Sequence, residues 1–113
     1  MDKLAAISQA LNLTAPEQMA LQGIFDEAQK QAAPLVQQAA GAQDSMLEAA
    51  RAGHDTAGSV QKLAAIRAQI KMVEADAFKQ ALSRLDENKK KKASKLYELM
   101  SGMFLARNWR SAN

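Results

Sequence analysis

Residues 13–51, LTAPEQMALQGIFDEAQKQAAPLVQQAAGAQDSMLEAAR, decide the fold because they carry one apolar seam at helical spacing. The seam residues follow one another at alternating steps of four and three: Leu21, Phe25, Ala28, Ala32, Leu35, Ala39, Ala42, Met46 and Ala49. This average step of about 3.5 residues is typical of a helix that keeps one line of side chains against another helix. The stretch therefore predicts one long helix packed along a partner helix.

The ends of this long helix are marked by capping residues. Thr14 is placed as the N-cap, Pro16 lies in the first turn, and Glu17 completes a capping box. We therefore expect a helix over residues 15–51, about 55 Å long. Pro34 lies inside it and removes one backbone hydrogen bond, which predicts a bend near residues 30–34 and no break.

The rest of the chain predicts further helices and one sharp turn. Gly53 and Gly58 bound a loop that reads as a hairpin tip. A second helix over 59–85 repeats the seam with larger side chains: Leu63, Ile66, Ile70, Val73 and Ala77. Shorter helices are expected over 2–11 and 87–105. The sequence thus predicts one all-α domain, 1–113, built as a long antiparallel helical hairpin with short terminal helices.

Composition restricts the classes of function. The 113 residues include no cysteine, which excludes disulfides, thiolate zinc sites and a cysteine nucleophile. No stretch reaches the roughly 18 apolar residues of a membrane span, so stable membrane insertion is not expected. No phosphate-binding loop or nucleophile motif is present, and we expect no enzyme activity.

Charge is divided unevenly along the chain. Residues 1–58 carry three basic and seven acidic side chains, whereas residues 59–113 carry twelve basic and five acidic ones. Such a division favours an antiparallel fold-back, within one chain or between two. Alanine supplies much of the apolar content and buries little area, so the core should be shallow. We therefore expect a homodimer.

Two helix starts carry a resemblance to a known family. Leu13-Thr14-Ala15-Pro16-Glu17-Gln18 and Leu85-Asp86-Glu87-Asn88-Lys89 flank the predicted hairpin. This arrangement resembles the Spy/CpxP superfamily of periplasmic helical-hairpin proteins, marked by two Leu-Thr-x-x-Gln motifs and related to the CnrX and ZraP metal-resistance proteins. The first motif is one residue longer than the family pattern, and the second has Lys89 where Gln is expected.

The resemblance implies a periplasmic, dimeric stress-response protein that acts as an ATP-independent chaperone without a cofactor. Its clients would be unfolded or partly folded proteins. Such binding needs exposed apolar groups beside positive charge. The candidate client-binding residues are Lys62, Arg67, Lys71, Met72, Met100, Met103 and Phe104.

The resemblance also implies an alternative, a heavy-metal sensor or metal-binding resistance protein. The candidate ligands for a transition-metal ion are His54 and Asp55, at the predicted tip. One histidine without cysteine is a poor ligand set, because transition-metal sites usually need three or four ligands.

Two further segments near the C-terminus carry basic residues, 89–92 and 108–113. Four consecutive lysines, 89–92, wrap around a helix without an aromatic neighbour, so we expect a solvated collar and no nucleic-acid partner. Residues 108–113 read as a frayed tail. Trp109 within it could dock on a partner helix or mark an interfacial or client-contact segment.

Overall fold

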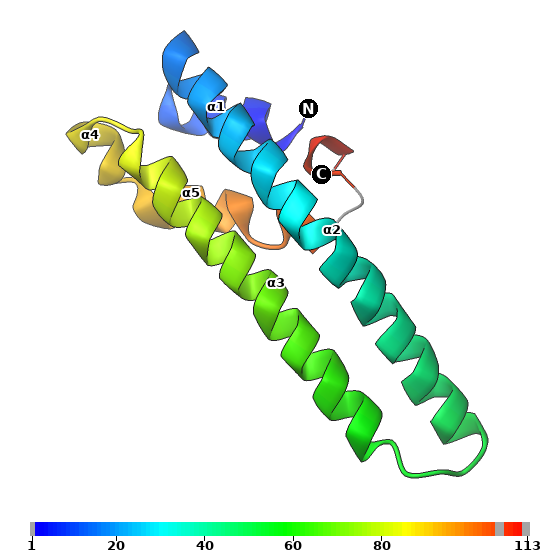
Figure 1. The fold of residues 1–113 in the computed structure, drawn as a ribbon. Helices are drawn as coiled ribbons and strands as arrows, with labels where there is room; N and C mark the ends of the chain where they lie inside the picture. Colours follow the sequence, from blue (N-terminus) through cyan, green and yellow to red (C-terminus); the bar gives the residue numbers. More distant parts are fainter. Residues whose placement is uncertain (1, 106–107, 112–113) are drawn as a thin grey trace.

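The computed structural model describes residues 2–105 and 108–111. Every regular element within these residues is helical, which confirms the all-α prediction (Figure 1). The elements are α1 (Lys3–Leu11), α2 (Ala15–Arg51), α3 (Ala57–Ser83), α4 (Glu87–Lys90), α5 (Ala93–Met100) and the short 3-10 helices η1 (Met103–Leu105) and η2 (Trp109–Ser111).

The two long helices α2 and α3 lie side by side and run in opposite directions, joined by residues 52–56 (Figure 1). They make the molecule elongated, with extents of 54 × 22 × 19 Å. The seam of α2 stays buried or half-buried from Leu21 to Ala49. The seam of α3 behaves in the same way from Leu63 to Ala77. The 3.5-residue pattern therefore identifies the faces along which the two helices meet.

Local signals explain where α2 begins and how it continues. The Thr14 hydroxyl accepts the Glu17 N–H at 3.3 Å, and the Glu17 carboxylate accepts the Thr14 N–H at 2.9 Å. These two bonds form the capping box expected from the sequence. The helix runs without a break through Pro34, whose side chain is exposed.

One expected helix is wrong. Residues 87–105 do not form a single helix but divide into α4, α5 and η1. The first division falls at residues 91–92, and the second at residues 101–102. Gly102 has a positive φ of 78°, which glycine adopts without steric cost and which turns the chain out of α5. This turn folds η1 back onto α2 and α3.

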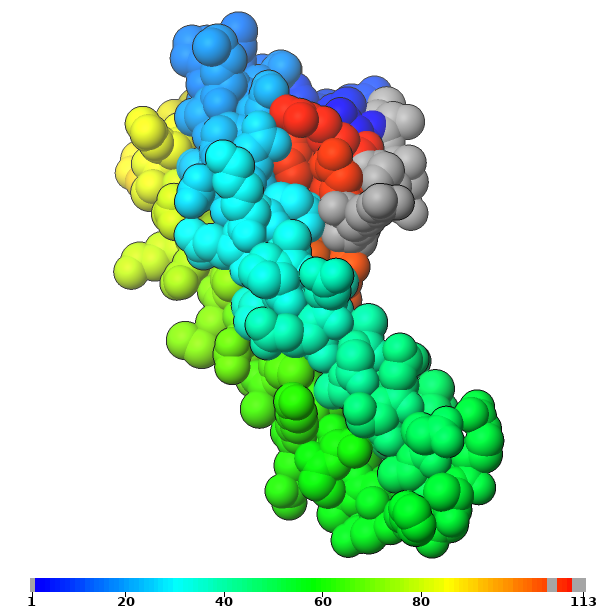
Figure 2. Space-filling view, turned by 45° about the vertical axis from the view of Figure 1, so that its right-hand side comes forward, coloured from blue at the N-terminus to red at the C-terminus, as the bar shows by residue number. Residues whose placement is uncertain are grey.

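The described residues form two regions that we call the head and the arm. The head comprises residues 2–32, 73–105 and 108–111, and the arm comprises residues 33–72. In the head, α1, α5, η1 and η2 pack on the paired long helices and enclose one apolar core. The arm holds only α2 and α3 and forms the narrower end of the molecule (Figure 2). Its separate small core consists of Ala42, Leu63, Ile66 and Ile70.

The C-terminal tryptophan belongs to the head core, so the expected frayed tail is wrong at this position. Trp109 is 1% exposed, and its ring lies 5.4 Å from the ring of Phe25, edge to face. Its indole Nε1–H donates to the Asp26 carboxylate at 2.9 Å. Arg110 also contacts that carboxylate, at 3.2 Å. An aromatic side chain with a satisfied polar atom can be buried at little cost, which explains this docking.

Candidate functional site

A pocket lies where the head ends and the arm begins, between α3 and the turn that follows α5. We call it the basic pocket. It has a volume of about 290 Å³. The residues that line it are Arg67, Ile70, Lys71, Glu74, Ser101, Gly102 and Leu105. It thus combines apolar side chains with two basic groups and one carboxylate.

The carboxylate of the pocket is fully engaged within the fold. Glu74 is 2% exposed and accepts hydrogen bonds from Lys71 Nζ and from the Gly102 N–H, each at 2.8 Å. A buried carboxylate requires such partners. The hydrogen bond to Glu74 also raises the pKa of Lys71, and Tyr97 adds to the shift. Glu74 therefore fixes the turn after α5 against α3 and neutralises Lys71.

Arg67 supplies the uncompensated charge of the pocket. It is exposed, and it lies one helical turn before Lys71. Among the described residues its guanidinium has no hydrogen bond or ion pair. Beside it, Leu105 is 55% exposed although it is a large apolar residue. An arginine can form paired hydrogen bonds with a carboxylate, so this arrangement suits an apolar segment that carries acidic groups.

The structure brings together only two of the seven residues proposed from sequence to bind clients. Arg67 and Lys71 line the basic pocket. Lys62 and Met72 lie exposed on α3 but do not line it, and Met72 is 68% exposed.

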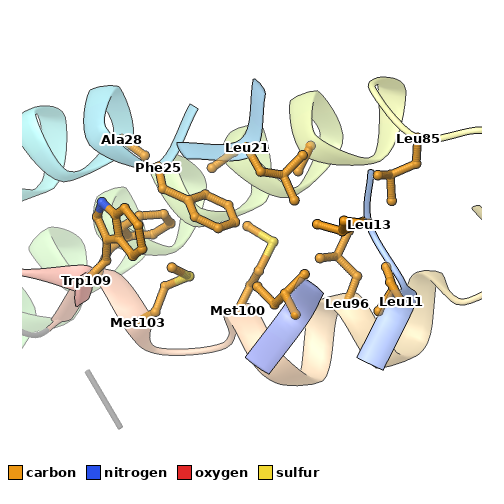
Figure 3. Close-up of a cluster of buried hydrophobic side chains, with 14 of the residues drawn as sticks. Leu11, Leu13, Leu21, Phe25, Ala28, Leu85, Leu96, Met100, Met103 and Trp109 are labelled. Atoms are coloured by element: carbon orange, nitrogen blue, oxygen red, sulfur yellow. The ribbon is translucent and has the colours of Figure 1, made fainter. Parts of the chain in front are cut away.

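The expected exposure of the other three proposed residues is wrong. Met100, Met103 and Phe104 are at most 1% exposed and belong to the head core. Figure 3 shows both methionines beneath α2, close to Phe25. Phe104 packs edge to face on Phe25 with ring centroids 6.1 Å apart. The apolar face of α5 and η1 is buried because the turn at Gly102 folds it onto the long helices, which leaves these side chains unavailable to a client.

The proposed metal ligands lie at the tip of the arm. His54 and Asp55 are both exposed. The Asp55 carboxylate accepts the Ala57 N–H at 3.0 Å and so helps to start α3. Within residues 2–105 and 108–111, no three His, Cys, Asp or Glu side chains gather as a metal site would require. The Asp55 carboxylate therefore has a structural role at the start of α3.

Sequence reasoning missed the remaining lining residues. Glu74 could have been found, because it lies four residues after Ile70 and three before Ala77, the spacing of residues that share the seam face of a helix. Leu105 gave no such signal, since its exposure depends on the fold of the turn before it. Lys89 was also misjudged. It is mostly buried and donates to Glu17, so it does not belong to a solvated collar.

Comparisons with protein families, with curated proteins and with solved structures find no match for this chain. Across the part that the structure describes, no helix combines the length and apolar character needed to cross a membrane. The basic pocket and its surroundings are the candidate functional site.

Proposed function

We propose that this chain is an ATP-independent, chaperone-like binding protein that holds exposed apolar segments of client proteins at the basic pocket. The observation that carries the proposal is Arg67, unpaired among the described residues, beside the exposed Leu105 and the apolar wall of Ile70. A charge that no described residue pairs and an apolar side chain that no described residue covers are the two features that such binding needs.

The binding would proceed in two physical stages. Positive charge around Arg67 would first attract acidic or polar client segments over a distance of about 8–10 Å, the range of screened electrostatics in cellular salt. Apolar contact would follow, at a gain of roughly 25 cal/mol for each Å² of apolar surface removed from water. A pocket of about 290 Å³ holds only one or two side chains at a time. Weak, exchangeable binding follows from that size.

The finer parts of the proposal rest on the resemblance to Spy/CpxP proteins. They are a periplasmic location, a role in stress response and a homodimer built on the antiparallel helical hairpin. The helix starts at Thr14 and Asp86 carry that resemblance, and both residues cap their helices in the fold.

Light scattering of reduced, denatured lysozyme tests the function. We expect the protein to suppress aggregation at stoichiometric ratios without ATP, and Arg67→Glu to weaken that suppression. Lys79→Glu is the matched control, because it makes the same charge change on α3 outside the basic pocket. No suppression at several-fold molar excess of the protein would overturn the proposal.

A further inference from the structure

The layer that covers the long helices in the head stops at the arm. Two acidic residues hold this layer: Asp26 on α2 accepts Trp109 Nε1–H, and Glu74 on α3 accepts the Gly102 N–H. Beyond them the same side of α2 and α3 continues toward the tip. In the arm no described segment covers it, and Figure 2 shows this end as the two long helices alone.

Helical spacing identifies the residues on this uncovered side of α2. Seven residues make almost two full turns of a helix, so residues seven apart share a face. From Asp26, steps of seven lead to Ala33, Ala40 and Leu47, all exposed. The seam of α2 keeps the same repeat as far as Ala49, so the face is maintained along the arm.

The same spacing identifies the facing residues of α3. From Glu74, steps of seven lead to Arg67 and Val60, and Val60 is 47% exposed. Lys71 and Ala64 lie one turn from these positions. Arg67 and Lys71 line the basic pocket, which places the pocket at the head end of this face. We call the whole uncovered face the open groove.

The open groove is apolar along α2 and basic along α3. Its residues are Ala33, Val36, Ala40, Gln43, Leu47, Val60, Ala64, Arg67 and Lys71. None of these is acidic, and the exposed Asp44, one turn from Ala40 and Leu47, lies at the outer edge of α2 beside them. Of the two basic residues of the face, only Lys71 is paired within the described structure. Several are alanine, which lets another backbone approach closely. The groove is therefore complementary to a surface with apolar and acidic groups.

The dimensions and the chemistry of the groove favour a helix as the occupant. Ala33 to Leu47 spans about 21 Å at 1.5 Å per residue, which matches a helix of about 14 residues. A groove between two helices accepts the ridge of a third. A helix also satisfies its own backbone hydrogen bonds, whereas an extended segment would find no sheet edge here. In the head, α5 and η1 already fill the corresponding layer.

We propose that the open groove binds one amphipathic helix of a partner protein, with an apolar stripe at three- and four-residue spacing and a flank of Glu or Asp beside Arg67. This inference rests on the proposed function and names the class of segment that the same site selects. The apolar stripe covers Val36, Ala40 and Leu47, and the acidic flank supplies the partner that Arg67 lacks within residues 2–105 and 108–111.

Fluorescence anisotropy with three labelled peptides tests the proposal on the full chain. The first peptide is a helix of about 14 residues with a leucine stripe and glutamate flanks. The second has lysine in place of each glutamate, and the third has the composition of the first in scrambled order. We expect the first to bind about ten-fold or more tightly than the other two, since like charges and loss of the stripe each oppose docking.

Three variants locate the binding. Ala40→Glu should abolish binding of the glutamate peptide, whereas Gln38→Glu should leave it unchanged, because Gln38 is exposed on the other side of α2. Arg67→Glu should reverse the preference in favour of the lysine peptide. Thermal melting followed by circular dichroism shows whether each variant keeps its fold. If one variant does not fold, a substitution at another exposed residue of the open groove replaces it.

The outcomes separate this inference from the proposed function. Suppression of aggregation with equal affinity for all three peptides would overturn the helix proposal and leave the chaperone-like function standing. Helix binding without any suppression would support the helix proposal and overturn the chaperone-like function. A dimer of the chain alone that Ala40→Glu separates would overturn the helix proposal, because a second copy would then occupy the groove.

Discussion

The head and the arm contain the same two helices and the same seam, yet they bury that seam in different ways. In the head, Phe25 packs edge to face against Phe104 and Trp109. The C-terminal segments close the core from a second side, opposite α2 (Figure 3). In the arm, the opposing helix is the one described segment that closes the seam, and the core is small.

The difference shows where a binding function can reside. The head completes its core with its own chain, so it gains little from a partner. In the part of the chain that the structure describes, no third layer covers the arm, and Leu47 and Val60 are about half exposed. Exposed apolar surface of this kind is a stability cost that a binding partner offsets. The covered region therefore stabilises the molecule, and the uncovered region remains available for recognition.

The largest effect is expected from removing the centre of the head core. Phe25→Ala should lower the free energy of unfolding by about 3–5 kcal/mol, because Phe25 is fully buried and contacts two other rings. Urea denaturation measures this loss. Met19→Ala, on the same helix but 74% exposed, is the control and should change stability by less than about 0.5 kcal/mol. Equal losses for the two variants would contradict the placement of the core.

A smaller effect is expected from the same kind of change in the arm. Ile66→Ala should cost about 2 kcal/mol, at the low end for such a truncation, because few residues surround Ile66 and they can relax around it. Hydrogen exchange should show the loss mainly in amides of the arm. If the amides of the head lost protection to the same degree, the two regions would not differ as described.

The attachment of the C-terminal segment gives an intermediate test of the head. Trp109→Phe keeps most of the ring packing but removes the indole donor to Asp26. We expect a loss of about 1–2 kcal/mol, since the Asp26 carboxylate loses one charge-assisted hydrogen bond. Asp26→Asn should give a similar loss in urea denaturation. Stability unchanged in both variants would show that this bond does not fasten the covering layer.

The smallest effect concerns an ion pair at the far end of the head. Lys89 hydrogen-bonds to Glu17 and lowers the pKa of Glu17 from 4.5 to about 2. A lowered folded-state pKa stabilises the protein above pH 4.5, and this contribution is lost as the pH falls toward 2. Glu17→Gln should therefore lower the free energy of unfolding at pH 7 by about 1 kcal/mol or less, which thermal melting shows as a lower midpoint temperature. The two proteins should converge near pH 2, and a constant difference at all pH values would contradict the pair.

Local and periodic features of the fold could be predicted from the sequence. The seam of α2 needs only a 3.5-residue repeat, and the helix start needs only Thr14 and Glu17, three residues apart. Such features depend on neighbours in the chain, so the sequence displays them directly. Of the candidate site, Arg67 and Lys71 were found for the same reason: they stand one turn apart on a predicted helix.

The remaining features depend on contacts between distant residues. Lys89 meets Glu17 across 72 positions, and Trp109 meets Asp26 across 83. The turn at Gly102 decides whether Met103 faces the core or solvent, and no periodicity extends through that turn. An apolar residue near the end of a chain suits either environment, so its burial could be learned only from the fold.

Hydrogen–deuterium exchange of the full chain, with and without the glutamate-flanked peptide, tests the central claim most directly. The arm should gain protection on both sides of the open groove, at residues 33–47 of α2 and 60–71 of α3, while α1 in the head stays unchanged. Increased protection confined to the head, or none at all at saturating peptide, would contradict the claim that the uncovered face of the arm is the binding surface.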